Sequence, residues 1–238
     1  PDIDLYAVKV LNVAGQGTWS AVISAYQWAV ANGMQITSNS YGGSTGSVAV
    51  ETALNAAVDA GVLMIFSAGN SGPADNTVRF PAKYAKAIAV SATDQTDAIA
   101  FFSSRGPEVA VAAPGVSIES TVLNGLYGLK SGTSMACPHV AGACALALSK
   151  GFTTAQVRER LTTMLPDKGV PGRDPLYGWG LLDAYQLVFG GDSTLPVFRS
   201  PVTLDAKASF DPDGIIVDWT YKLSDGRTLT GAVQTVSL

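Results

Sequence analysis

The sequence predicts an α/β fold in which helices cover both faces of a parallel sheet. Strand-like apolar runs alternate with helix-like runs along the chain, and short glycine-rich links join them. This alternation is typical of parallel sheets, whose neighbouring strands are connected by crossover helices. The composition agrees with a compact domain, because 47% of the 238 residues are hydrophobic and only 14% are charged.

The predicted strands are short apolar runs that stop at glycine or polar residues. The first, Leu5–Leu11, reads LYAVKVL, and we expect it to be a buried strand. The other three are Ile36–Ser40, Val62–Ala68 and Ala85–Ala92. Sites in parallel sheets lie at the carboxyl ends of the strands, which directs attention to Ser40–Gly43 and Ser67–Gly72.

The predicted helices have apolar residues at helical spacing. Trp19–Ala31 shows this pattern most clearly, and Gly33 follows it where a helix stop is expected. The remaining predicted helices are Val48–Ala60, Thr133–Leu148 and Thr153–Leu165.

The sequence pattern changes after Phe189. Residues 190–196, GGDSTLP, have the composition of a linker. Beyond them, short alternating runs are separated by turns at Asp211–Gly214 and Ser224–Gly226, which predicts a small, partial antiparallel β module. We therefore expect a main domain over residues 1–189, a linker over 190–196 and a β domain over 197–238.

Charge and hydropathy exclude two classes of partner. The net charge is −4 and the sequence contains no basic stripe, so we predict no binding of nucleic acid. The longest apolar stretches, such as Gly61–Ala68, are too short to span a membrane, so we predict no membrane partner.

The two cysteines, Cys137 and Cys144, are expected to be free and buried. They are seven residues apart on a predicted helix, which places them about 10 Å apart along its axis. A disulfide needs Cα atoms within about 7 Å.

Two segments carry the candidate chemistry. Ser134 lies in SGTSMACPHVAG at the start of a predicted helix, where unpaired N–H groups favour a developing negative charge. Asn70 lies in SAGNSG after a predicted strand, and its amide could donate to an oxyanion. Taken singly, such a serine is usually a helix cap and such an asparagine a turn residue.

Together these segments resemble the subtilisin-like serine proteases (subtilases, peptidase S8). SGTSMACPHVAG is similar to the nucleophile motif of the family, and SAGNSG is similar to its oxyanion-hole motif. Five further segments follow in the order of the family: AVKVLN at 7–12, SYGG at 40–43, FPAKY at 80–84, FSSRG at 102–106 and APG at 113–115. The resemblance covers residues 1 to about 189.

The resemblance implies a three-layer, subtilisin-like fold and a secreted, monomeric endopeptidase that cleaves protein or peptide substrates without a cofactor. It makes Ser134 the nucleophile, with its N–H and the Asn70 side chain as the oxyanion hole. Two walls would pair with an extended substrate chain. One wall is Ser40, Tyr41 and Gly42, and the other is Ser67, Ala68 and Gly69.

Arg79 departs from the pattern of the family, which commonly has a small residue at this position, on the floor of the pocket for the residue before the scissile bond. We therefore predict a shallower or cationic pocket that prefers acidic or small side chains. The alternative is that Arg79 extends into solvent.

The general base is the feature that the sequence does not supply. Its one histidine, His139, is five residues after Ser134, so the two side chains project about 140° apart around a helix. We interpret His139 as structural, and a dyad of Ser134 with Lys130 or Lys150 as a weaker alternative.

The order of the family is Asp, His, then Ser, but residues 1–133 contain no histidine and no HGTH-like or D-[ST]-G-like motif. We therefore interpret the chain as an N-terminally truncated fragment that is inactive and unstable alone. The alternative is a noncatalytic peptide-binding pseudoprotease or an adhesion fragment.

Two secondary expectations follow from resemblance. A structural calcium site could use carbonyls near Ala82 and Tyr84 with Asp94, although a single carboxylate favours a solvated surface instead. The segment 204–226, with its DPDG turn, Trp219 and SDG turn, resembles the first half of a PKD domain, an immunoglobulin-like β-sandwich.

Overall fold

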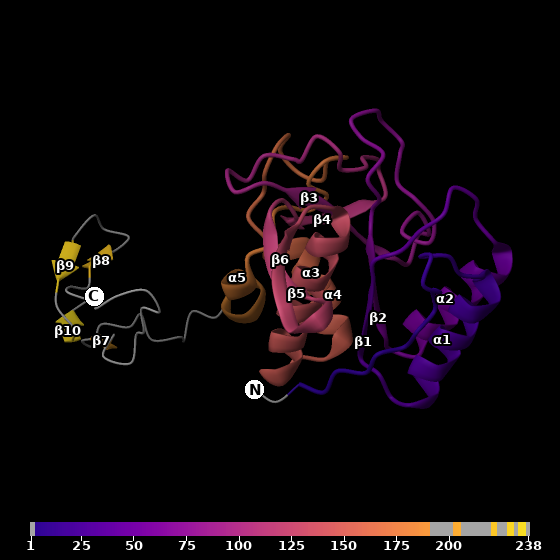
Figure 1. The fold of residues 1–238 in the computed structure, drawn as a ribbon, viewed down its shortest axis with the longest axis horizontal. Helices are drawn as coiled ribbons and strands as arrows, with labels where there is room; N and C mark the ends of the chain where they lie inside the picture. The colour runs from indigo at the N-terminus through magenta and orange to yellow at the C-terminus, as the bar shows by residue number, and fades with distance from the viewer. Residues whose placement is uncertain (1–2, 191–201, 206–219, 223–227, 231–232, 237–238) are drawn as a thin grey trace. The chain divides into compact units, whose positions relative to one another are not determined.

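The structure, a computed structural model, describes residues 3–190 and four short segments near the C-terminus: 202–205, 220–222, 228–230 and 233–236. The chain divides into two compact units, Pro1–Gly191 and Asp192–Leu238. Each unit is described by itself below (Figure 1).

A four-stranded parallel sheet forms the centre of the first unit. Its strand order is β1 (Ile36–Asn39), β2 (Leu63–Ser67), β3 (Ile88–Thr93) and β4 (Val109–Pro114). All residues of β2 and β3 are buried, as expected for strands that are covered on both faces.

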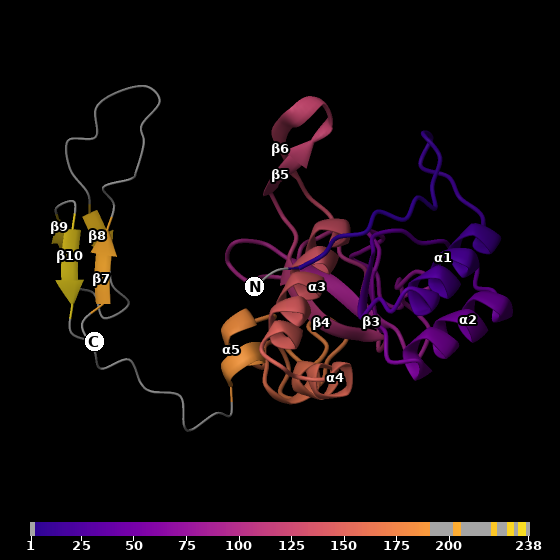
Figure 2. The ribbon, with the colours of Figure 1, turned by 90° about the horizontal axis from the view of Figure 1, so that it is seen from below.

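Helices cover both faces of this sheet, which confirms the predicted α/β class (Figure 2). Alternate residues of β2 point to opposite sides, with Leu63 and Ile65 in one core and Met64 and Phe66 in the other. The first core packs under α3 (Thr133–Ser149), α4 (Thr154–Thr163) and α5 (Ala184–Phe189). The second packs under α1 (Trp19–Ala31) and α2 (Val48–Asp59).

In the first unit, most predicted elements occur with ends shifted by a few residues, and four strands and helices were missed. The missed elements are β4, α5 and a hairpin of β5 (Ile118–Val122) and β6 (Leu126–Lys130), which the short 3₁₀ turn η1 (Leu123–Gly125) connects.

Among the described helices, none is long and apolar enough to cross a membrane.

The predicted strand at Leu5–Leu11 is wrong. This segment forms no strand, and its first residues are solvent-exposed, with Leu5 94% and Tyr6 58% accessible. An apolar, β-branched run becomes a strand only when a neighbour hydrogen-bonds to it, and no strand of the described residues pairs with this segment.

The second unit contains two antiparallel pairs. One is β7 (Val202–Asp205) with β10 (Val233–Val236), and the other is β8 (Thr220–Lys222) with β9 (Thr228–Thr230). The predicted linker after Gly190, both predicted turns and Trp219 lie outside the described residues. The resemblance to a PKD domain therefore stays a prediction.

Candidate functional site

Nearly all predicted site residues line one cavity of about 270 Å³. It lies where the segments after β1 and β2 meet the N-terminus of α3. Its lining residues are Ser40, Tyr41, Gly42, Ser67, Gly69, Asn70, Ser71, Arg79, Thr133 and Ser134. Of the predicted site residues, only Ala68 is absent from this lining, because it is fully buried.

Ser134 is the second residue of α3, so its backbone N–H has no acceptor within the helix. The preceding turn favours glycine, because Gly132 has a φ of 158° and a Cβ there would lie 3.2 Å from Asn70 Nδ2. The Gly132 N–H donates to the Gly115 carbonyl at 2.8 Å. The Ser40 hydroxyl donates to the carbonyl of Ser134 at 2.8 Å. These contacts hold the first turn of α3 at the rim of the cavity.

Thr133 fixes the orientation of the Asn70 amide. Both its backbone N–H and its hydroxyl donate to Asn70 Oδ1, each at 2.9 Å. Because Oδ1 accepts these bonds, Nδ2 is the atom of this amide that remains able to donate. The Thr133 hydroxyl in turn accepts from the N–H of Gly69 at 3.1 Å. Sequence reasoning missed Thr133, although it is adjacent to Ser134 in the motif.

Arg79 lies along the cavity and does not extend into solvent. Its Nε and Nη2 donate to the Ser71 hydroxyl at 3.0 and 2.8 Å. The aliphatic part of its side chain crosses two glycines: a Cβ at Gly69 would lie 2.6 Å from Arg79 Cγ, and a Cβ at Gly42 would lie 3.2 Å from Arg79 Cβ. Ser71, which sequence reasoning also missed, anchors this arginine.

The two predicted walls differ in the backbone groups that they can offer. The Ala68 N–H donates to the Val90 carbonyl, and the Ala68 carbonyl accepts from the Arg79 N–H. The Gly69 carbonyl accepts from the Ser104 N–H. Within the described part of the chain, Tyr41 and Gly42 make no backbone–backbone hydrogen bonds. The wall after β1 is therefore the better template for an extended chain.

Tyr41 closes one side of the cavity as a neutral group. Its hydroxyl is hydrogen-bonded to Asn39 Oδ1 at 3.0 Å and to the Tyr26 hydroxyl at 3.2 Å. Burial raises the pKa of Tyr41 to about 12 and raises the pKa of Tyr26 further above its usual value.

No imidazole lines the cavity within the described residues. His139 is exposed on α3, where its Nδ1 donates to the Met135 carbonyl at 2.8 Å. Lys130 and Lys150 do not line the cavity either. The two cysteines of α3 are free and buried, as expected, and burial raises the pKa of the Cys144 thiol to about 12.

The predicted calcium ligand Asp94 is engaged within its own turn. Its Oδ1 accepts from the N–H and hydroxyl of Thr96 and from the N–H of Ala98. These bonds, the Thr96 hydroxyl foremost, hold the pKa of this carboxyl below its usual value. In the described ranges no group of three His, Cys, Asp or Glu could hold a metal ion. Calcium binding stays a prediction.

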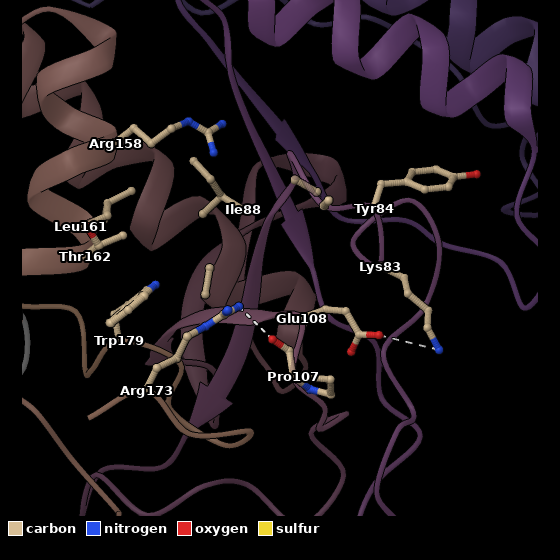
Figure 3. Close-up of a pocket in the computed structure, with 13 residues that line it drawn as sticks. Lys83, Tyr84, Ile88, Pro107, Glu108, Arg158, Leu161, Thr162, Arg173 and Trp179 are labelled. Carbon is tan, nitrogen blue, oxygen red and sulfur yellow. Dashed lines mark hydrogen bonds and ion pairs between the residues drawn. The ribbon is translucent and has the colours of Figure 1, made fainter. Parts of the chain in front are cut away.

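A second cavity of about 430 Å³ lies near the starts of β3 and β4 and contains no predicted site residue (Figure 3). Arg173 Nη2 donates to the carbonyls of Pro107 and Val109 at 2.7 and 3.2 Å, and its guanidinium lies over the Trp179 ring. Arg158 Nη2 donates to the Lys86 carbonyl at 3.1 Å. Since both arginines bind main-chain carbonyls, we interpret this cavity as structural.

Comparison with known proteins points to one family. The sequence model of the "Subtilase family" matches residues 1–180. Subtilisin E of Bacillus subtilis (strain 168) is 46% identical over 187 residues, which are 77% of this chain and 48% of that protein. Subtilisin of Bacillus pumilus is also 46% identical, over 77% of this chain and 67% of that protein.

A solved structure agrees with this match. The crystal structure of a lanthipeptide protease superimposes with a TM-score of 0.70 at 26% identity, and the match covers 76% of this chain and 68% of that one. The chain spans about half the length of several of the curated relatives it matches.

Proposed function

The chain belongs to the subtilase family of subtilisin-like serine endopeptidases, and from this premise we propose that Ser134 is the nucleophile of peptide-bond hydrolysis. The observation that carries the proposal is the joint placement of Ser134 and Asn70. Both line one cavity, and Thr133 holds the Asn70 amide so that Nδ2 keeps no hydrogen-bond partner among the described residues.

In the proposed reaction, Ser134 Oγ attacks the carbonyl carbon of the scissile bond and transfers its proton to a general base. The carbonyl oxygen becomes an oxyanion, which accepts hydrogen bonds from the Ser134 N–H and from Asn70 Nδ2. The C–N bond then breaks, and the amine leaves with the proton that the base returns. Water hydrolyses the acyl group on Ser134 and restores the hydroxyl.

We further propose that the general base lies outside these 238 residues. The one histidine of the sequence is His139, which is exposed and hydrogen-bonded to its own helix. A serine hydroxyl is a weak nucleophile without a base, so we expect the 238-residue chain to hydrolyse peptides very slowly by itself. The secreted, extracellular setting of the protein is part of the same proposal, on the strength of its bacterial subtilisin relatives.

The second candidate function is noncatalytic binding of peptides, which the lack of an imidazole at the described cavity favours. Residues 204–226 resemble a PKD domain, and we propose that they belong to an accessory β domain of an extracellular protein. The antiparallel pairs β7–β10 and β8–β9 support that proposal, because a β-sandwich is built from antiparallel strands.

A fluorophosphonate probe tests the proposal, with added imidazole as a substitute base. We expect slow labelling that peptide mapping assigns to Ser134, that imidazole accelerates and that Ser134→Ala abolishes. His139→Gln is the matched control and should leave the rate unchanged. A rate that falls in His139→Gln would identify a base within the chain. Peptide binding without any labelling of Ser134 would favour the noncatalytic function.

A further inference from the structure

We infer that the cavity beside Ser134 selects substrates with an acidic side chain immediately before the scissile bond, and that Arg79 is the residue that determines this specificity. The inference rests on the proposed function of Ser134 and names the class of substrate for that site. Its basis is the position of the Arg79 side chain in the cavity, the hydrogen bonds that hold it there and its positive charge.

Arg79 is held in the cavity from three sides. The Ser71 hydroxyl accepts from Nε and Nη2, while Gly69 and Gly42 leave room for the aliphatic part of the side chain. Gly69 has a φ of 113°, a backbone conformation that favours glycine. Because the stem is confined in this way, the guanidinium keeps a defined position at the cavity.

The guanidinium still has hydrogen-bond donors for a ligand. It carries five N–H groups, and the two hydrogen bonds to Ser71 are its only side-chain bonds among the described residues. The ion pairs in that part of the chain are Lys83–Glu108, Lys86–Asp59 and Lys168–Asp97, so none of them includes Arg79.

Arg79 is also the one charged residue in the lining of this cavity. The other lining residues are glycine, serine, threonine, asparagine and tyrosine, and Tyr41, whose pKa burial raises to about 12, is neutral at pH 7.5. A bulky apolar side chain in the cavity would remove water from a cation without giving it a partner. A carboxylate would instead form a charge-assisted hydrogen bond with the guanidinium.

Peptide boronic acids that differ only in the side chain next to boron test the inference. A boronate forms a tetrahedral adduct with a serine hydroxyl, and on this inference the adduct with Ser134 would place the adjacent side chain in the cavity. For the 238-residue chain at pH 7.5, we expect the glutamyl boronate to bind about 10- to 100-fold more tightly than the glutaminyl and phenylalanyl boronates.

Variants of Arg79 give the decisive comparison. Arg79→Gln should abolish the preference for glutamyl over glutaminyl boronate, and Arg79→Glu should transfer it to a lysyl boronate. Lys83→Gln is the matched control, because it removes an equal charge from outside this cavity, and it should keep the glutamyl preference.

The outcomes separate this inference from the proposed function. Equal binding of glutamyl and glutaminyl boronates that still requires Ser134 would overturn the acidic specificity alone. Binding that Ser134→Ala leaves unchanged, or no binding of any boronate, would overturn both the proposed nucleophile and the specificity that rests on it.

Discussion

Thr133, whose side chain is almost fully buried, fixes the orientation of the Asn70 amide. The pair of donors on Thr133 requires an oxygen at the position of Oδ1, and this leaves Nδ2 able to donate to the proposed oxyanion. The interaction can therefore be dissected with a substitution that keeps the oxygen and removes the nitrogen.

Asn70→Asp is that substitution. Its carboxylate still accepts from Thr133, but it cannot donate to an oxyanion and it adds a negative charge where one develops. We expect imidazole-assisted fluorophosphonate labelling of Ser134 to fall at least about 100-fold, the lower end of the loss found when one such donor is removed from a subtilisin. Asn55→Asp on α2 adds the same charge outside the cavity and should label at the wild-type rate. Equal rates for Asn70→Asp and wild type would remove Asn70 from the oxyanion hole.

Tyr41 links the cavity to stability at alkaline pH. Burial raises its pKa from about 10 to about 12, so the unfolded state releases this proton at lower pH than the folded state. The stabilising contribution is complete below pH 10 and is lost as the pH rises towards 12, by about 2 to 3 kcal/mol.

We therefore expect Tyr41→Phe to lose less free energy of unfolding than wild type between pH 9 and 11 in urea titrations. Tyr127→Phe, at a tyrosine that is 71% exposed on β6, should behave as wild type. An identical alkaline loss in Tyr41→Phe and wild type would contradict the role of burial.

At the scale of elements, sequence periodicity predicted helices better than strands. α1 has the predicted bounds, because the apolar spacing and the stop at Gly33 are local features of the sequence and need no partner elsewhere in the chain. The segment Leu5–Leu11 has a strong strand pattern but no partner among the described strands, and a pattern cannot supply one. β4 was missed because its alanine-rich sequence, VAVAAP, carries little strand preference.

α3 joins the candidate site to the core, since Ser134 is in its first turn and Val140 is fully buried further along. We expect Val140→Ala to lower the free energy of unfolding by about 2 kcal/mol, through lost apolar burial and the cavity that remains. Leu146→Ala, at a residue of the same helix that is 39% exposed, should cost clearly less. Chemical denaturation measures both, and equal costs would contradict the packing of this helix face.

At the scale of the whole molecule, the candidate site assembles from segments far apart in the sequence. The cavity combines residues after β1, residues after β2, Arg79 and the start of α3. The motifs and the carboxyl-end rule for parallel sheets predicted which segments to examine. They could not predict the contacts of Thr133 with Asn70 or of Ser71 with Arg79, because such hydrogen bonds depend on how separate segments meet.

In the proposed mechanism, Ser134 and Asn70 act on one reacting centre. The most direct measurement is a crystal structure of the 238-residue chain with a glutamyl peptide boronate. We predict a bond between boron and Ser134 Oγ, with one boronate oxygen within hydrogen-bond distance of both the Ser134 N–H and Asn70 Nδ2. A boronate that bonds to another residue, or whose oxygens point away from Asn70, would contradict the account.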